Sequence, residues 1–241
     1  MEIKVENSMD FFENDESSKV FQFIPDCHKD NRGYFMEVFK ETNDEFSKIP
    51  AWMRDSRWIK QVNRSSSTGG VIRGCHAQKG KFCQGKLVEA VNEKIYDIIT
   101  DARPDSGSFG TSMVFLLDPE IHNKLWVPRG FLHAFVVPFS VKNPAIFEYY
   151  CDNVYDHSSE LGINPVTILP EVVKTFKELM WNVSEDYNDL YEVFEKKDSC
   201  VYSEKDMKGM DYQDFISEVR SDYEKRNKVW YRWSTRHISE T

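Results

Sequence analysis

The stretch KLVEAVNEKIYDIITDAR (residues 86–103) contains two short segments in which polar residues recur among apolar ones. Alternate residues of an extended strand lie on the same face of that strand. Lys86, Val88 and Ala90 would therefore share a face with Gln84, which lies just upstream. Both segments have the length and composition of β-strands, so this stretch predicts a β-rich fold.

The second segment places two carboxylates on an otherwise apolar face. Ile95, Asp97, Ile99 and Asp101 would all point to the same side of the strand. This arrangement suits the interior of a barrel that holds a polar ligand. An edge strand with two solvated aspartates would have the same spacing, so the spacing alone leaves both interpretations open.

Similar short segments extend from Val20 to about Phe139 and are separated by turn-forming sequences such as KDNRG, SSSTGG and PDSGSFG. Many short strands at this spacing predict a β-sandwich or barrel. The further segments are VFQFIP, GYFMEVF, WIKQVN, SMVFLL, KLWVP, HAFVVPF and FEYYCDNVY.

The character of the chain changes near Pro170, after which three segments have helical periodicity. We therefore expect a loose arm at 1–19, a β-domain at 20–170 and a helical extension at 171–241. In the extension, Phe215, Val219 and Tyr223 would form one apolar stripe. Such a stripe favours a helical cap packed on the sheet or on a second subunit, and a partner-binding tail is the alternative.

Composition limits the classes of function. The 241 residues carry a net charge of −9, so no basic surface is expected that would bind nucleic acid. Five cysteines without a CxxC pair predict free thiols and a cytoplasmic location. The N-terminus does not have the pattern of a signal peptide, and no apolar run is long enough to cross a membrane.

Two histidines follow glycine-containing bends, His76 in RGCH and His133 in PRGFLH. A histidine inside a barrel can be a metal ligand, a general base or a satisfied core residue. Metal-binding cupins usually carry HxH, whereas here His76 is followed by Ala77 and Gln78. The sequence therefore predicts no metal site.

Eight segments stand in a fixed order along this chain: KDNRGYFMEVF, QVNRSSS, VIRGCHAQ, QGKLV, YDIITDARPDSGSFG, LWVPRGFLHAF, EYYCDNVY and SSELGI. Together they resemble the dTDP-4-dehydrorhamnose 3,5-epimerase family over roughly residues 20–168. The resemblance implies a mainly β, cupin-type jelly roll (double-stranded β-helix), a homodimer, and neither metal nor organic cofactor. It also implies a dTDP-linked 4-keto-6-deoxy sugar as substrate, inverted at C3 and C5 through an enolate.

The same resemblance implies roles for individual residues. His76 falls at the position of the base, and Tyr149 falls at that of the acid on the opposite face of the sugar. The neighbouring Tyr150 would point the other way along a strand. Lys86 would stabilise the negative charge that develops on the enolate oxygen.

A carboxylate near the C-terminus is expected to orient the base. Asp206 ends an SEKD segment that matches the family's pattern, although it lies later in the chain than usual. Asp186, at the end of VSED, lies at a more ordinary distance and is the alternative.

The resemblance also implies a set of substrate-binding residues. Arginine suits this role because its planar guanidinium can donate two hydrogen bonds to phosphate oxygens. Without the resemblance, Arg32 and Glu37 would be interpreted as an ordinary surface pair. The expected residues are Arg32, Glu37, Gln61, Asn63, Arg73, Lys86, His133, Glu160 and Lys205.

Three departures from the family's pattern predict an altered pocket shape. Ala77 replaces a bulky residue after the base, Ala134 replaces a glycine, and residues 164–167 replace a usual Trp-Asn-Asp. Other functions therefore stay open at this point: epimerisation at C3 alone, ketoisomerisation, or nucleotide-sugar binding without turnover. A metal-dependent cupin oxygenase is disfavoured by the missing HxH.

Overall fold

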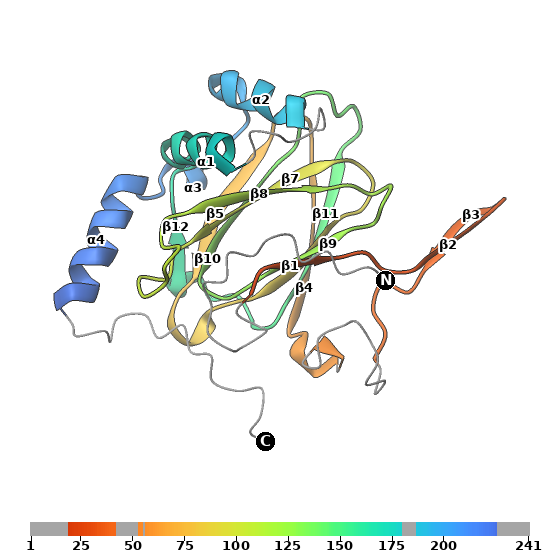
Figure 1. Cartoon of the computed structure of the whole chain (residues 1–241), viewed down its shortest axis with the longest axis horizontal. Coiled ribbons are helices and arrows are strands. Elements are labelled where there is room, and N and C mark those ends of the chain that lie inside the picture. Colours follow the sequence, from red (N-terminus) through yellow and green to blue (C-terminus); the bar gives the residue numbers. More distant parts are fainter. Residues whose placement is uncertain (1–18, 42–52, 55, 180–186, 226–241) are drawn as a thin grey trace.

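The computed structural model describes residues 19–41, 53–54, 56–179 and 187–225. Two five-stranded antiparallel sheets face each other (Figure 1), which confirms the predicted jelly roll. We call them sheet I and sheet II. Sheet I has the order β1 (Phe21–Phe23), β9 (Lys124–Val127), β6 (Lys86–Ala90), β11 (Ala145–Cys151) and β4 (Gln61–Ser67). Sheet II has the order β12 (Glu160–Gly162), β5 (Ile72–Gln78), β10 (Phe131–Val136), β7 (Ile95–Asp101) and β8 (Ser112–Leu117).

The space between the sheets is filled by alternate residues of their strands. Val88 and Phe147 of sheet I pack in one buried cluster with Ile99 and Phe135 of sheet II. The rings of Phe135 and Phe147 have centroids 4.4 Å apart. Because side chains alternate along a strand, the same period that buries these residues also directs polar side chains into the sandwich.

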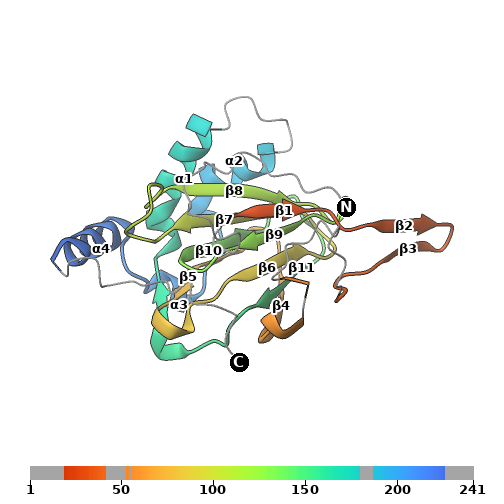
Figure 2. The same ribbon diagram turned by 60° about the horizontal axis from the view of Figure 1, so that its bottom comes forward.

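Helices cover the outer face of sheet II, as Figures 1 and 2 show for α1 and α4. The helices are α1 (Pro165–Leu179), α2 (Asn188–Glu195), α3 (Glu204–Met207) and α4 (Tyr212–Lys225). Single 3-10 turns span Ser56–Trp58, Gly80–Phe82, His157–Ser159 and Lys197–Ser199. Phe215 and Val219 of the predicted stripe are buried under this cover, while the side chain of Tyr223 lies outside the described residues.

Helix α1 begins earlier than the change in sequence character near Pro170. Asn164 Oδ1 accepts a hydrogen bond from the Val166 N–H (3.0 Å), and Pro165 occupies the first helical position. Both are start signals for a helix. Residues 164–167 therefore begin a helix that continues across residue 170, without a break between the expected β-domain and the extension.

Strands β2 (Cys27–Asp30) and β3 (Gly33–Met36) form a separate hairpin. It projects from one end of the sandwich in Figures 1 and 2. Tyr34 and Phe35 are 56% and 66% exposed, although the Tyr34 ring lies 4.5 Å from that of His122.

Residues 200–210, which we call the strap, run along sheet II. Val201 forms a parallel bridge with Val71, and Met210 forms another with Ile163. Each bridge is held by two backbone hydrogen bonds of 2.9 to 3.0 Å. One end of the strap is thus bridged to Val71, the residue before β5. The other end is bridged to Ile163, which itself pairs with Cys75 of β5. Among the described residues, no helix is long and apolar enough to span a membrane.

Candidate active site

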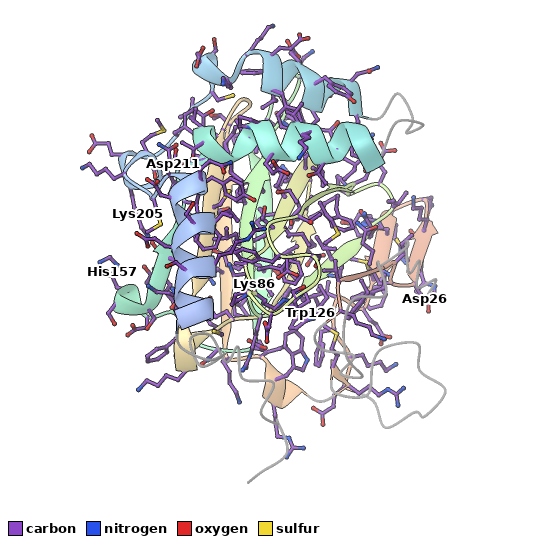
Figure 3. All side chains as sticks on the ribbon, turned by 60° about the vertical axis from the view of Figure 1, so that its left-hand side comes forward. Asp26, Lys86, Trp126, His157, Lys205 and Asp211 are labelled. Carbon is purple, nitrogen blue, oxygen red and sulfur yellow. The ribbon has the colours of Figure 1, made fainter. Side chains whose placement is uncertain are left out.

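A pocket of about 460 Å³ opens between the sheets, within the size range of small-molecule sites. Sheet II, sheet I and the strap all contribute to its wall. Figure 3 shows Lys86 among the strands, with Lys205 and His157 at the outer edge of the molecule. The lining side chains that could take part in chemistry are Ser65, Arg73, His76, Lys86, His133, Tyr149, Tyr202, Ser203, Lys205 and Asp206.

His76 of β5 meets a carboxylate from the strap. Its Nε2 lies 2.9 Å from Asp206 Oδ1, and the Asp206 side chain is only 5% exposed. Burial alone would raise the pKa of Asp206, but the nearby His76 imidazole, the Ser203 side chain and the Gly74 backbone together outweigh burial and lower it. The alternative carboxylate, Asp186, lies outside the described residues.

Helix α3 sets the position of Asp206. The helix is capped by Ser203, whose Oγ accepts a hydrogen bond from the Asp206 N–H (3.0 Å). Lys205 Nζ lies 2.6 Å from Glu160 Oε1, which ties the strap to β12. Tyr155 donates a second hydrogen bond to Glu160 (2.9 Å).

Lys86 and Tyr149 enter the pocket from sheet I. The Lys86 ammonium lies 5.9 Å from the centroid of the Tyr149 ring. Burial lowers the pKa of Lys86 and raises that of Tyr149, because it disfavours the charged form of each. Tyr150 points to the outer face of sheet I, where its hydroxyl donates to Glu148 (2.5 Å).

A second histidine–carboxylate pair lies in the sandwich and was not predicted. His133 Nε2 is 2.7 Å from Asp97 Oδ2, and the Asp97 side chain is fully buried. Burial lowers the pKa of His133, although Asp97 opposes this shift. The pattern Ile95-Asp97-Ile99 placed Asp97 on an apolar face, but its spacing left an inward and a solvated carboxylate equally open. The other inward aspartate, Asp101, instead accepts hydrogen bonds from Arg103 and nearby serines.

The backbone before His76 packs against β10. Gly74 has φ +108°, and a Cβ there would lie 2.5 Å from the His133 carbonyl oxygen and 2.7 Å from Ala134 Cα. Only glycine fits this conformation and this contact without strain. The two histidine-bearing strands therefore pack closely beside His76.

The remaining expected site residues divide into two groups. Arg73 and Lys205 line the pocket. Gln61 Nε2 donates to Asn63 Oδ1 (2.9 Å), and Asn63 Nδ2 donates to Cys151 Sγ (3.7 Å). Gln61, Asn63 and Glu160 are not among the side chains of the pocket wall.

Arg32 and Glu37 do not reach this pocket within one chain. Arg32 caps the projecting hairpin, is 86% exposed and pairs with Asp30 (2.5 Å). The Glu37 carboxylate lies 3.2 Å from Lys40 Nζ, in the exposed segment that directly follows the hairpin. The motif KDNRGYFMEVF, which contains Arg32 and Glu37, did not indicate that the hairpin projects from the sandwich.

The family model described as dTDP-4-dehydrorhamnose 3,5-epimerase matches residues 16–214. This chain belongs to that family. Members of the family are epimerases, so the protein is an isomerase.

Individual relatives agree with this assignment. The dTDP-4-dehydrorhamnose 3,5-epimerase of Escherichia coli is 35% identical over 139 residues, which cover 58% of this chain and 71% of the relative. That of Shigella flexneri is 38% identical over 144 residues, covering 60% and 75%.

A solved structure from Legionella pneumophila is described as a dTDP-6-deoxy-D-glucose-3,5-epimerase in complex with dTDP-4-keto-L-rhamnose. It is similar to this chain with a TM-score of 0.62 and 26% identity, over 83% of this chain and 91% of that one.

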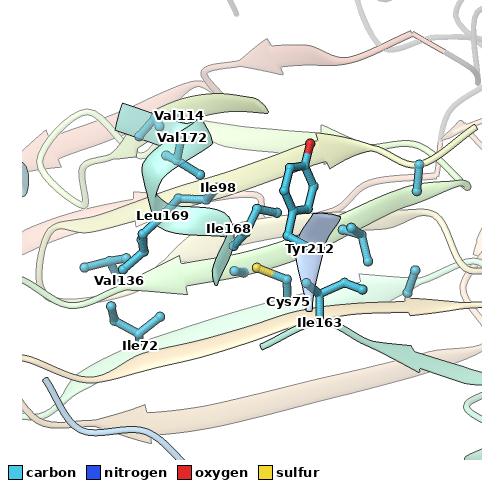
Figure 4. Packing of buried hydrophobic residues seen from close by; sticks show 14 of the residues in the cluster. Ile72, Cys75, Ile98, Val114, Val136, Ile163, Ile168, Leu169, Val172 and Tyr212 are labelled. Atoms are coloured by element: carbon cyan, nitrogen blue, oxygen red, sulfur yellow. The ribbon is translucent and has the colours of Figure 1, made fainter. Parts of the chain in front are cut away.

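One departure from the epimerase family's pattern does not alter the pocket in the way we expected. Ala77 has its side chain in the buried cluster on the outer face of sheet II, beneath the helices, and is not among the residues that line the pocket. Ala134 belongs to the same cluster but also lines the pocket. Cys75 is a further member of the cluster, and Figure 4 shows it beside Ile168 and Tyr212. A small residue at position 77 leaves room for the helical cover, because strand residues that flank an inward His76 point outward.

Among the described residues, no group of three His, Cys, Asp or Glu side chains gathers as a candidate metal site. The described site offers two imidazoles, each paired with a carboxylate, together with the Lys86 ammonium and the Tyr149 phenol.

Proposed function

We propose that this epimerase inverts C3 and C5 of a dTDP-linked 4-keto-6-deoxy sugar, which yields dTDP-4-dehydrorhamnose or a close analogue. The observation that carries the proposal is the arrangement of His76 with Asp206 on one wall of the pocket and Lys86 with Tyr149 on the other. Inversion needs a base on one face of the carbon and an acid on the opposite face. The arrangement supports this requirement.

His76 is the proposed base. With Nε2 turned toward Asp206, Nδ1 is the nitrogen that takes the proton from the carbon next to the C4 ketone. The electron pair of the broken C–H bond forms the enolate, whose oxygen is stabilised by the buried Lys86 ammonium. Asp206 stabilises the imidazolium that forms.

Tyr149 is the proposed acid. Its phenol donates a proton to the other face of the same carbon, and the electron pair of the enolate forms the new C–H bond. Because burial raises the pKa of Tyr149, the phenol is held in the protonated form that donation requires. His133, paired with Asp97, would bind the same oxygen as Lys86.

Solvent exchange tests this function. Incubating the protein with dTDP-4-keto-6-deoxyglucose in deuterated water should place label at both C3 and C5, as read by NMR. Label at C3 alone would indicate a C3 epimerase, and no label would contradict turnover. His76→Ala should lower the exchange rate by about 10²-fold or more at both carbons, whereas the control variant His157→Ala should leave it unchanged.

We further propose that the protein acts as a homodimer in which the hairpin docks on the second copy. An isolated two-stranded hairpin is marginally stable in water, and this one exposes Tyr34 and Phe35. Docking would also explain how Arg32 and Glu37 could serve a pocket that they do not line in their own chain. The substrate-binding roles of Gln61, Asn63, Arg73, Glu160 and Lys205 are part of the same proposal.

Mixing two inactive variants tests the shared site. A hybrid of Arg32→Ala and His76→Ala subunits would contain one complete pocket, so mixing and re-equilibrating them should restore exchange. No restoration would contradict delivery of Arg32 across the dimer. Sedimentation of the wild-type protein would show independently whether a dimer forms.

A cytoplasmic location is also proposed, because all five cysteines are free thiols in the structure. Cell fractionation tests it, and recovery outside the cytoplasmic fraction would contradict it.

A further inference from the structure

Lys86 is the first residue of β6, so its position depends on how that end of the strand is held. Cys151 is its partner across the β11 ladder. The next residues outward are Gly85 and Asp152, just beyond the ends of the two strands. Nothing in the proposed chemistry uses these two residues.

Asp152 holds Gly85 from both sides. The Gly85 N–H donates to Asp152 Oδ1 (2.7 Å), and the Asp152 N–H donates to the Gly85 carbonyl (3.1 Å). The Asp152 side chain is 7% exposed. The backbone of Gly85, directly before Lys86, is thus held by a buried carboxylate as well as by the hydrogen bonds of the strand ladder.

Arg129 holds the other oxygen of the same carboxylate. Its Nε donates to Asp152 Oδ2 (2.8 Å). Burial raises the pKa of Asp152, and the positive charge of Arg129 opposes this rise. Arg129 lies in the turn between β9 and β10, and β10 carries His133. One carboxylate therefore connects the strand ends that present Lys86, Tyr149 and His133.

The space beside Gly85 leaves no room for a side chain. A Cβ on Gly85 would lie 2.5 Å from the Trp126 ring and 3.0 Å from Asp152 Oδ2. Trp126 is itself 1% exposed. The backbone of Gly85 thus packs closely against an indole and a carboxylate at the start of β6.

We propose that Asp152, held by Arg129, is a positioning residue that fixes the Lys86 ammonium at the enolate oxygen. The inference rests on the proposed function. Asp152 does not line the pocket and would act only through Lys86. Displacing a charge-stabilising group by about 1 Å can cost on the order of 10²-fold in rate.

A double-mutant cycle separates this role from a merely structural one. Asp152→Ala should lower kcat for deuterium exchange by about 10- to 100-fold with KM changed less than about threefold. In a Lys86→Met background, the same substitution should change kcat less than about twofold, because the group it positions is already gone. Equal losses in both backgrounds would overturn the proposal.

Two further variants guard against simple misfolding. Arg129→Met removes the second contact of the carboxylate and should show the same dependence on Lys86. Glu148→Gln is the matched control. Like Asp152, Glu148 is a buried carboxylate of the β11 region that accepts a hydrogen bond from an arginine, here Arg64. Unlike the strand end that carries Lys86, Glu148 faces away from the pocket. It should leave kcat within about twofold of wild type. A loss in Glu148→Gln as large as in Asp152→Ala would overturn the specific role of Asp152.

A measurement without substrate distinguishes failure of the inference from failure of the proposed function. In 15N-lysine NMR of the intact protein, the Lys86 resonance, identified by its absence in Lys86→Met, should shift in Asp152→Ala and not in Glu148→Gln. Its titration midpoint should move toward that of an ordinary lysine as the ammonium gains water. An unchanged Lys86 resonance in Asp152→Ala would overturn positioning, even if wild-type exchange is observed. If the wild-type protein shows no deuterium exchange but the Lys86 resonance shifts in Asp152→Ala, only the proposed function would be overturned.

Discussion

Replacing Asp206 by asparagine removes a charge from the base pair while keeping the shape of the side chain. The Asp206 carboxylate lies 2.9 Å from His76 Nε2 and is 5% exposed. During proton abstraction the imidazole becomes positively charged, so the carboxylate stabilises the transition state more than the ground state. Asp206→Asn should therefore lower kcat and leave KM nearly unchanged.

The geometry sets the size of this effect. Two unit charges 2.9 Å apart interact by about 6 kcal/mol at an effective dielectric constant of about 20. The His76 side chain is 27% exposed, so we take about half of that value, or about 3 kcal/mol, after solvent screening. Each 1.36 kcal/mol corresponds to a tenfold change in rate, which gives a loss of about 10²-fold.

The assay is initial deuterium incorporation at C3 and C5, measured at saturating substrate. Glu204→Gln is the control, because Glu204 lies on the same short helix with a side chain that is 94% exposed. That variant should retain the wild-type rate. If Asp206→Asn retains more than about half of the wild-type rate, the electrostatic role of Asp206 is refuted.

Three other substitutions give separate tests. Burial lowers the pKa of Lys86 from 10.5 and raises that of Tyr149. Lys86 should therefore lose its proton first as the pH rises, and kcat should fall at alkaline pH. Lys86→Arg should move this fall to higher pH in a pH–rate profile. Tyr149→Phe should leave proton removal partly intact but slow inversion, and equal rates of inversion in variant and wild type would remove Tyr149 from the mechanism. In Gly74→Ala, the new Cβ would lie 2.5 Å from the His133 carbonyl oxygen. This substitution should cost about 3 kcal/mol of folding stability and lower Tm by about 6–12 °C in a thermal melt. An unchanged Tm would show that β5 and β10 can separate locally.

Period and turn chemistry were enough to predict a sandwich or barrel, because alternation along a strand is a local property, whereas the jelly roll was implied by the family resemblance. The structure shows that Asp97 points inward, whereas the same alternation left both an inward and a solvated position open. It could not indicate the partner of Asp97, because that depends on the register between β7 and β10, where Phe135 lies opposite Asp97 and His133 opposite Ile99. Register is set by packing of the whole sheet rather than by either segment alone.

Two other features needed the three-dimensional structure. The pairing of His76 with Asp206 spans most of the chain, and the matching SEKD segment indicated it only because the family pattern was known. The small residue Ala77 suggested a changed pocket, but it lies under helices whose packing on sheet II no local pattern reports. The side of a sheet that a neighbouring element covers is decided by tertiary contacts.

The proposed base and acid belong to different sheets, His76 to sheet II and Tyr149 to sheet I. No single strand therefore fixes their separation. The two layers of a sandwich stand about 10 Å apart, and interior rings such as Phe135 and Phe147 maintain that gap. Hydrostatic pressure, which eliminates internal voids, should accordingly alter the rate of proton transfer before it unfolds the protein.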